Sequence, residues 1–472
     1  MTEARKKWIR EQARFQGIFD RKIYKESMFG KKIPLSSSMI YEEEKVFTEQ
    51  IFETEFSSRQ TIRLEKELAG YMGVKYAVAL NSGQAALHLA LKVAAEKLYG
   101  SSTGILTPDG LRGGSLYGKR VFCSDLTTFD MVNPIVFEGG APVFIDSSED
   151  TDWSMDPEVL ELAFERYPDV KIVVMNHVYG FPGQALKIRQ ICHEHDALLV
   201  ECAGEAIGAE YLVEDGEAET EGGIWEKTGT LGDYCVLDFG RGRMIGQSGG
   251  AFLTKDYYAS EKVRYWASGA KAATFWNQHE ELGYSCLMDE FVAAVLRGQL
   301  MHIDDIIEKK KQIYDRYVEK LDESIACVIP VQDGTKPNYW ITAMTCESNI
   351  QFMETRSDRQ YTYEDIHGTA APMEICEALD AFNAESRPVY KPMSMQPVFR
   401  NNEHFTLDGP WRMYENFRND TFWPRCDMAK QYYESGLCLP SDAGMTEEEQ
   451  DRIIEIICAC YDRADLERVA WV

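Results

Sequence analysis

The chain has 472 residues, and its 50 Lys and Arg against 77 Asp and Glu give a formal net charge of −27 at pH 7. Such acidity argues against nucleic acid or an anionic membrane surface as the main partner, while 44% hydrophobic residues suffice for the core of an enzyme-sized protein. No window approaches the ~20 apolar residues of a membrane-spanning helix, and the 12 cysteines show no C-x-x-C spacing. We therefore expect a cytoplasmic protein with reduced thiols.

The first predicted elements indicate an anion-binding site. Residues 1–32, rich in Lys, Arg and aromatics, indicate a helical arm, and 59–73 form an amphipathic pattern that ends at a glycine. A short buried strand at 76–80 leads through the turn NSG into a helix at 84–100. Because the first amides and the positive dipole end of that helix face the turn, the junction favours an anion.

Short apolar runs then alternate with helical stretches. Before the helix that ends near residue 167, Asp156 is placed as the N-cap and Pro157 as the first helical residue. This alternation predicts an α/β fold with a mainly parallel sheet covered by helices on both faces, and ligands at the carboxyl ends of its strands. The predicted strands are 120–124, 142–146, 171–176, 197–201, 234–238 and 251–254.

A long helical stretch at 288–324 precedes a region that we interpret as a smaller C-terminal α+β domain. Two polar insertions, 99–118 and 347–370, are expected to be loops, and the first would form a lid over the site. The predicted organisation is an N-terminal arm and a segment packing on the small domain (1–58), a large α/β domain (59–305), and a linking helix with the small domain (306–472).

Seven motifs occur in order over about residues 33–460: ELAGYMGVKYAVALNSGQAALHLAL, GGAPVFIDS, HVYG, VECAGEAIGAEY, LRGQL, ESRPVYKPMSMQPVF and GLCLPSD. In these motifs the chain resembles the DegT-type (DnrJ/StrS) sugar-nucleotide aminotransferases, nearest the branch that aminates 4-keto-6-deoxy sugars of the bacillosamine type. The resemblance implies the fold-type I architecture of pyridoxal-phosphate transferases, a homodimer with active sites at the subunit interface, and a nucleotide-sugar ligand. The ligand-binding residues that it implies are Ser82, Gly83, Gln84, Arg387, Tyr390 and Lys391.

The cofactor chemistry of that family needs a lysine that forms a Schiff base. The resemblance places Arg243 on this position, and an arginine stays protonated and cannot form the imine. The serine that helps hold the cofactor phosphate falls on Asp238, and the acid that protonates the pyridine nitrogen falls on Cys202. We therefore expect no cofactor: covalent binding of pyridoxal phosphate is not expected, while non-covalent binding stays possible.

Two further cofactor contacts are altered. The residue that stacks on the ring falls on Thr128, and the partner-subunit motif G-Y-N-Y-R reads GYSCL, with Ser285 for Asn and Leu287 for Arg. Five changes in one pocket favour a site that was rebuilt or retired as a unit. A misplaced Schiff-base lysine would have to be one of Lys227, Lys255 and Lys271.

The altered pocket has several interpretations. Arg243 and Asp238 would form a buried ion pair that plugs an empty cavity. Alternatively, Arg241 and Arg243 would bind an anionic group, with another side chain as acid, base or nucleophile. A metal on His177 with Asp238 or Glu205 has no recognised spacing, so no metal site is expected. The candidate catalytic residues are Arg243, Cys202, His177, Glu205 and Asp238, and Thr128, Arg241 and Ser285 complete the ligand-binding set.

Three functions follow from these interpretations. The first is an enzyme of sugar or natural-product biosynthesis that acts on a nucleotide sugar, or another anionic metabolite, without Schiff-base chemistry. The second is a non-catalytic subunit that pairs with an active paralogue. The third is a pyridoxal-phosphate-dependent sugar aminotransferase whose lysine lies elsewhere in the chain.

Overall fold

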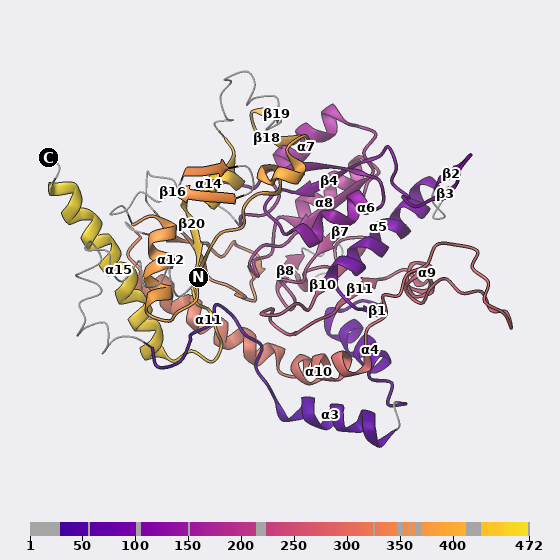
Figure 1. The fold of residues 1–472 in the computed structure, drawn as a ribbon, viewed down its shortest axis with the longest axis horizontal. Helices are drawn as coiled ribbons and strands as arrows, with labels where there is room; N and C mark the ends of the chain where they lie inside the picture. Colours follow the sequence, from indigo (N-terminus) through magenta and orange to yellow (C-terminus); the bar gives the residue numbers. More distant parts are fainter. Residues whose placement is uncertain are drawn as a thin grey trace.

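The computed structural model describes most of the chain, and its large α/β domain lies beside a smaller domain that contains the C-terminal helix (Figure 1). The described residues are 29–54, 57–100, 105–149, 152–213, 223–323, 326–346, 353–357, 360–364, 370–411 and 426–470. Most of the N-terminal arm predicted at 1–32 lies outside the described residues.

A nine-stranded sheet forms the centre of the large domain, in the order β1-β11-β10-β7-β6-β4-β5-β18-β19. Adjacent strands from β10 to β18 pair in parallel, whereas β11 pairs antiparallel with both β1 and β10. The mainly parallel sheet is therefore confirmed, and every predicted strand lies within one residue of an observed one. The strands are β1 (Tyr76–Leu80), β4 (Arg120–Ser124), β5 (Ala141–Ile145), β6 (Ile172–Asn176), β7 (Leu198–Cys202), β10 (Tyr234–Asp238), β11 (Gly250–Thr254), β18 (His404–Thr406) and β19 (Gly409–Trp411).

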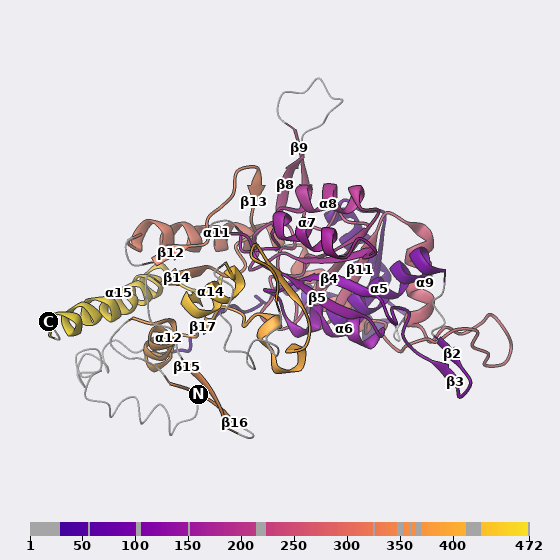
Figure 2. The ribbon, with the colours of Figure 1, turned by 90° about the horizontal axis from the view of Figure 1, so that it is seen from above.

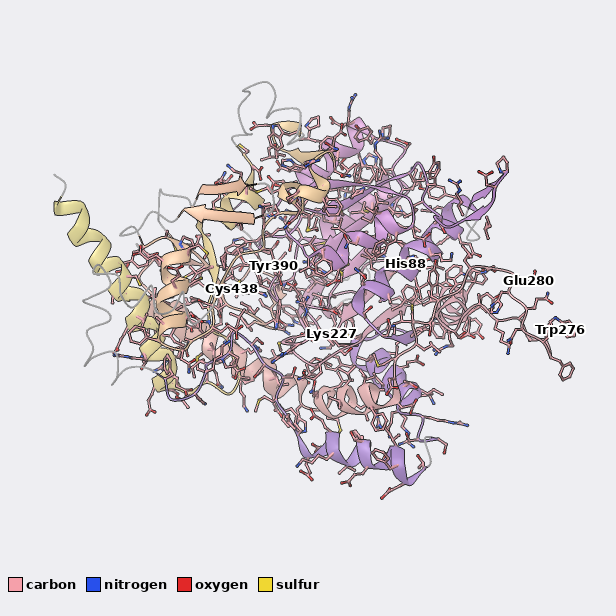
Figure 3. The ribbon with its side chains drawn as sticks, viewed as in Figure 1. His88, Lys227, Trp276, Glu280, Tyr390 and Cys438 are labelled. Atoms are coloured by element: carbon pink, nitrogen blue, oxygen red, sulfur yellow. The ribbon has the colours of Figure 1, made fainter. Side chains whose placement is uncertain are left out.

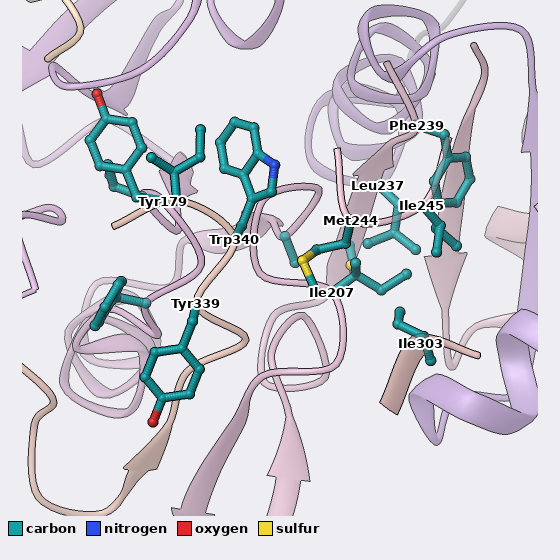
Figure 4. Packing of buried hydrophobic residues seen from close by; sticks show 14 of the residues in the cluster. Tyr179, Ile207, Leu237, Phe239, Met244, Ile245, Ile303, Tyr339 and Trp340 are labelled. Atoms are coloured by element: carbon teal, nitrogen blue, oxygen red, sulfur yellow. The ribbon is translucent and has the colours of Figure 1, made fainter. Parts of the chain in front are cut away.

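Both faces of this sheet are buried. Successive residues of a strand point to opposite faces, so the consecutive apolar residues of these strands place apolar side chains on both. In β1, Val78 and Leu80 belong to the cluster under one layer of helices, while Ala77 and Ala79 belong to the cluster on the opposite face. Figure 4 shows part of the second cluster, which includes Leu237 at the end of β10. The helices of the large domain are α4 (Gln60–Met72), α5 (Gly83–Tyr99), η2 (Phe129–Met131), α6 (Asn133–Phe137), α7 (Pro157–Arg166), α8 (Ala185–Glu194), α9 (Tyr257–Ala267) and α10 (Glu290–Leu300).

Helix α5 starts directly after β1 and is buried along most of its length. Its run of Ala and Leu favours a helix and permits close packing on β10 and β11. Ser82 caps the amino end by accepting a hydrogen bond from the Ala85 amide, and Gly100 ends the helix at a φ of 73°. The helix therefore begins at the carboxyl edge of the sheet and ends at the opposite edge.

The small domain holds a four-stranded antiparallel sheet in the order β12-β14-β20-β17. Helices α12 and α15 contact each other, and their apolar residues share one core with Ile33 of the N-terminal segment. Farther along that segment, α3 packs on α10 of the large domain. The elements are α3 (Glu42–Glu53), α11 (Ile303–Lys320), β12 (Ala326–Val328), β14 (Ala343–Cys346), α12 (Pro372–Ala381), β17 (Arg387–Pro388), η3 (Met393–Met395), η4 (Pro397–Phe399), α14 (Met428–Ser435), β20 (Gly436–Cys438) and α15 (Glu447–Ala470).

The predicted helical stretch at 288–324 is two helices, α10 and α11. The chain breaks at Met301 and His302, where the His302 ring stacks 3.9 Å from the Tyr41 ring and two aspartates occupy the first turn of α11. Acidic side chains favour a new helix amino end, so the break follows from this local charge pattern and the stacking.

The two insertions expected to be loops contain short hairpins instead. Insertion 99–118 holds β2 (Ile105–Thr107) and β3 (Gly110–Arg112), and 347–370 holds β15 (Met353–Ser357) and β16 (Gln360–Glu364). In the first, the sequence Pro-Asp-Gly supplies the turn, with Gly110 at a φ of 116°. A third small sheet joins β8 (Glu210–Val213), β9 (Ile224–Lys227) and β13 (Thr335–Lys336), which Figure 2 shows at one side of the large sheet.

Within the part of the chain that is described, no helix is long and apolar enough to cross a membrane. The domain boundaries, the lid role of 99–118 and the cytoplasmic location stay predictions.

Candidate functional site

Polar side chains gather where the carboxyl ends of β7 and β10 meet the small domain. Cys202 ends β7, Asp238 ends β10, and the first turn of α5 lies beside them. From the small domain, the segment after β17 brings Tyr390 to the same place, near the middle of the molecule in Figure 3. The structure therefore joins residues from both domains in one site.

Arg243 is the centre of this site. Its Nη1 lies 2.8 Å from Glu205 Oε1, and its Nε donates to Asp238 Oδ2 at 3.0 Å. The guanidinium also lies 4.4 Å from the centre of the Trp340 ring. Burial alone would lower the pKa of Arg243, but the carboxylate of Glu205, followed by Tyr390 and Asp238, raises it, so the group stays charged. The predicted Arg243–Asp238 ion pair is present, and Glu205 is its third member.

Glu205 links Arg243 to the small domain. It is almost fully buried, and it accepts hydrogen bonds from the Tyr179 amide at 2.8 Å and the Tyr390 hydroxyl at 3.0 Å. Arg387 donates to the same Tyr390 hydroxyl at 3.1 Å. We call Arg243, Glu205, Tyr390 and Arg387 the arginine cluster. In it, Arg243 contacts the buried Glu205 carboxylate directly, and Arg387 is linked to that carboxylate through the Tyr390 hydroxyl.

Aromatic rings pack beneath the arginine cluster. The Tyr179 ring lies 4.9 Å from Tyr390 and 6.4 Å from Trp340, and Figure 4 shows the Tyr179 and Trp340 rings near each other. Trp340 was not predicted as a site residue. It lies far from Arg243 and Arg387 in the sequence, and its contacts with both guanidinium groups depend on tertiary packing. The only local signal was the run Asn-Tyr-Trp at 338–340.

Asp238 packs against the amino end of α5. A Cβ added to Gly83 would lie 2.5 Å from Asp238 Cβ, so only glycine leaves room for this carboxylate. Ser82 is engaged as the helix cap. Gln84 donates to Asp130 Oδ1 at 3.2 Å, and burial, then the charge of Asp238, raises the pKa of Asp130. Thr128 precedes η2 at the same edge as its N-cap, half-buried.

His177 and Cys202 lie behind the arginine cluster. The Gly183 amide donates to His177 Nδ1 at 3.1 Å, so the proton of the neutral ring is on Nε2, which faces Glu201 at 3.1 Å. Burial, then the carboxylates of Glu201 and Glu205, raises the pKa of the Cys202 thiol well above its usual range. These contacts favour a structural histidine and a neutral thiol, so their catalytic roles stay predictions without support from this geometry.

Three more predicted ligand residues, Arg241, Ser285 and Lys391, are also outside the arginine cluster. Arg241 and Ser285 are exposed, and Lys391 lies with its ammonium 6.0 Å from the Tyr433 ring. Two of the candidate Schiff-base lysines have side-chain partners elsewhere: Lys227 pairs with Glu210, and Lys255 donates to the Thr230 carbonyl. Lys271 is exposed, and its backbone forms an isolated β-bridge with that of His279. Within the described ranges, no group of three or more His, Cys, Asp and Glu side chains is arranged to hold a metal ion.

This architecture, a mainly parallel sheet with an anion-favouring helix at its carboxyl edge and an antiparallel small domain, is that of the fold-type I pyridoxal-phosphate transferases. A solved sugar-aminotransferase-family structure from Brucella abortus shares the fold, with a TM-score of 0.69 and 19% identity over 89% of this chain and 95% of its own. The chain belongs to the DegT/DnrJ/EryC1/StrS aminotransferase family, whose model matches residues 40–458. The family predicted from the sequence is confirmed.

Curated relatives cover most of the chain. The protein named "Putative pyridoxal phosphate-dependent aminotransferase EpsN" of Bacillus subtilis is 29% identical over 86% of this chain and 88% of its own. GDP-perosamine synthase of Caulobacter vibrioides is 26% identical over 84% of this chain and 88% of its own. Spr1654 from Streptococcus pneumoniae, solved in a PLP-form, aligns with a TM-score of 0.70 and 18% identity over 92% of this chain and 99% of its own.

The prediction that no cofactor takes part is wrong on these comparisons. EpsN is named for pyridoxal phosphate, and Spr1654 has been solved in both a PLP-form and a PMP-form. The prediction rested on five altered positions in one pocket, and these do not outweigh an aminotransferase match that runs from residue 40 to 458. That Arg243 stands in for the Schiff-base lysine stays a prediction.

The residues of this edge fit such a cofactor at one end. The first turn of α5 suits a phosphate, because helix amides and the positive dipole end point there. Asp238 would have to turn away, since two like charges at ~4 Å repel by about 4 kcal/mol at an effective dielectric of 20. Arg243 offers no imine-forming amine. If residue 243 takes the place of the lysine, as predicted, a cofactor at this edge would be held by its phosphate and not by a bond to residue 243.

Proposed function

We propose that this protein is a sugar aminotransferase that binds a nucleotide-linked 4-keto-6-deoxy sugar at the carboxyl edge of its large sheet. The family and the relative named GDP-perosamine synthase support an amino transfer to a nucleotide sugar. The observation that carries the proposal is the arginine cluster at the meeting of the two domains.

The arginine cluster supports an anionic ligand. The Arg387 guanidinium lies 5.9 Å from the Trp340 ring centre, on which Arg243 also packs, and Arg387 Nε is buried without a hydrogen-bond partner in the described structure. A buried donor without a partner costs free energy that a ligand oxygen would recover. The diphosphate of a nucleotide sugar presents such oxygens, and paired arginines bind them well.

Pyridoxal or pyridoxamine phosphate would be held non-covalently, with its phosphate at Ser82, Gly83 and Gln84 on the first turn of α5. When bound, it would supply the electron sink that amino transfer requires. In this proposal Tyr390 and Glu205 orient the sugar through their shared hydrogen bond, and Trp340 and Tyr179 keep water from that side of the pocket.

Two measurements test the proposal. The protein, supplied with pyridoxamine phosphate, is incubated with UDP-, GDP- and dTDP-linked 4-keto-6-deoxy sugars, and the amino sugar is sought by mass spectrometry. An amino product with at least one of them is expected, and it should be absent with Arg387→Ala but present with Arg400→Ala, an exposed control in η4's C-cap. No product and no binding of any of these sugars would reject the function.

The mode of cofactor binding is tested separately. After addition of pyridoxal phosphate and reduction with borohydride, the digested protein should carry no modified lysine, although the cofactor should protect it against thermal unfolding. A modified lysine in the digest would instead show the third function and identify the misplaced residue.

The proposed assembly is a homodimer. The loop between α9 and α10 extends away from the body, and Figure 3 shows Trp276 and Glu280 at its far end. At its tip the Phe275 side chain is fully exposed and Trp276 is 64% exposed. Aromatic rings are rarely left in water in this way, and a second copy of the chain would cover them.

Analytical ultracentrifugation tests the dimer. The wild type should sediment as a dimer, and a Phe275→Ala/Trp276→Ala variant should shift toward the monomer. Val398→Ala, an exposed apolar residue elsewhere, should not change the sedimentation. A monomeric wild type at micromolar concentration would contradict the assembly.

A further inference from the structure

A second cavity, of about 640 Å³, lies at the opposite edge of the large sheet from the arginine cluster. Its walls are formed by the residues at the start of β7 and β10, by those at the end of β11, and by the carboxyl-terminal turns of α5 and α8. Helix α5 joins the two places: Gly83 starts it beside Asp238, and Lys97 lines the cavity about 21 Å along its axis. The size is that of an ordinary small-molecule pocket.

Two of the acidic side chains around this cavity are already bonded to the backbone. Asp233 Oδ2 accepts the Leu199 amide at 3.0 Å. Asp256 Oδ1 caps α9 by accepting the amides of Tyr258 and Ala259. Both carboxylates are therefore held by hydrogen bonds to the backbone, and Asp196 is the remaining acid of the lining.

The basic side chains are less engaged. Among the described residues, Lys255 Nζ has one hydrogen-bond partner, the neutral Thr230 carbonyl at 3.1 Å, and Lys97 Nζ lies at a long 3.9 Å from Asp233 Oδ1. Arg189, on the exposed side of α8, has no hydrogen-bond or ion-pair partner among the described residues. In a chain of net charge −27, three lightly engaged cations around one cavity form a local site for negative charge.

We propose that this second cavity binds a small phosphorylated anion, with Arg189, Lys255 and Lys97 as its ligands. Arginine and lysine recognise phosphate through charge-assisted hydrogen bonds, and the cavity has room for a group larger than phosphate itself. The site is separate from the proposed sugar site, because it lies at the other end of the same strands.

Inorganic pyrophosphate is the probe, and isothermal titration calorimetry on the full chain is the measurement. The wild type should bind it, and Arg189→Gln and Lys255→Gln should each weaken binding by about tenfold or more, since each removes one charge-assisted contact. Lys187→Gln is the matched control: it is exposed on the same helix, bonds only to Gln184, and should leave the affinity unchanged.

Pyrophosphate could also meet the arginine cluster, so Arg387→Gln is measured beside these variants. A loss of pyrophosphate affinity in Arg387→Gln alone would place the anion at the sugar site and overturn the proposal. Wild-type affinity in both cavity variants would also overturn the proposal, and so would the absence of any pyrophosphate binding. The basic side chains would then act only by stabilising the negative carboxyl ends of α5 and α8. None of these outcomes decides the amino-transfer assay, so the two proposals fail independently.

Discussion

At the scale of single residues, Arg243 shows how one side chain ties the two domains together. Its guanidinium bonds Asp238 and Glu205 of the large domain and lies on Trp340 of the small domain. Arginine suits this place because its planar group pairs with carboxylates and stacks on an aromatic ring at the same time. A lysine there would keep the charge and lose the stacking.

The exchange Arg243→Lys tests the resemblance on which this position was assigned. If residue 243 is the Schiff-base position, the new amine should be captured by pyridoxal phosphate, and borohydride should fix the cofactor to residue 243. Mass spectrometry of the digested variant, beside the wild type, reads this directly. A variant that binds the cofactor but carries no adduct at residue 243 would contradict the assignment.

Removal of the Glu205 charge should be costly, because the buried Arg243 guanidinium then keeps only Asp238 as a charged partner, and the charge that Arg387 faces through Tyr390 is lost. Glu205→Gln is expected to lower the free energy of unfolding by about 3 kcal/mol, as for other broken buried ion pairs. Glu42→Gln, in an exposed pair with Lys45, should change it by less than about 0.5 kcal/mol. Urea denaturation compares the two, and equal effects would show that Glu205 is not held as described.

At the scale of elements, the glycine at the start of α5 allows the end of β10 to pack closely against this helix. Gly83 has Asp238 against it, whereas Gly70, inside α4, has nothing within 4 Å of an added Cβ. The same substitution should therefore have opposite effects at the two helices.

Gly83→Ala should lower the free energy of unfolding by about 1–3 kcal/mol through overpacking. Gly70→Ala should raise it by about 0.5–1 kcal/mol, because alanine favours the helix and has open space. Thermal or urea unfolding of the two variants gives the signs. A stabilised Gly83→Ala protein would mean that Asp238 does not pack on this helix.

The elements also show what could be predicted from the sequence. Strands such as β4 and β10 were placed correctly because buried parallel strands read as short apolar runs between turns. The cap at Asp156 was predicted because a cap acts over only a few residues. The break at His302 was missed because it depends on a ring contact with Tyr41, which is distant in the chain. Local signals were enough for local structure only.

For the site, the sequence was sufficient for residues that follow strand ends. Asp238 and Glu205 were chosen because the family resemblance places them where the cofactor is bound, at the carboxyl edge of the sheet where ligands gather. The prediction did not pair Glu205 with Arg243, and it did not find Trp340, because both depend on how the small domain packs on the large one. His177 was a candidate by its motif, yet its two ring nitrogens face Gly183 and Glu201.

At the scale of the whole molecule, β18 and β19 extend the large sheet at one edge. A group of buried charged side chains lies beside β18. Asp125, at the end of β4, accepts two hydrogen bonds from Ser394 and lies near His404 and Asp427. Burial raises the pKa of Asp125 to about 6; His404 opposes this rise and Asp427 adds to it. The folded chain therefore holds a proton on Asp125 that the unfolded chain releases near its ordinary pKa.

This proton should make stability depend on pH. Between about pH 4 and pH 6 the folded state binds more protons at Asp125 than the unfolded state, so the contribution of this group falls as the pH rises. Asp125→Asn should reduce the difference in unfolding free energy between pH 5 and pH 7 by about 1 kcal/mol. Urea titrations at both pH values measure it, and an unchanged difference would contradict the buried, protonated carboxyl.

If the arginine cluster binds a nucleotide sugar, calorimetric titration with the UDP-, GDP- and dTDP-linked sugars will detect it. We expect saturable binding of at least one sugar to the wild type and to Arg400→Ala. Arg387→Ala should lose about 1.5–3 kcal/mol of binding free energy, the range for a hydrogen bond to a charged group. Equal affinity of Arg387→Ala and the wild type would contradict sugar binding at the arginine cluster.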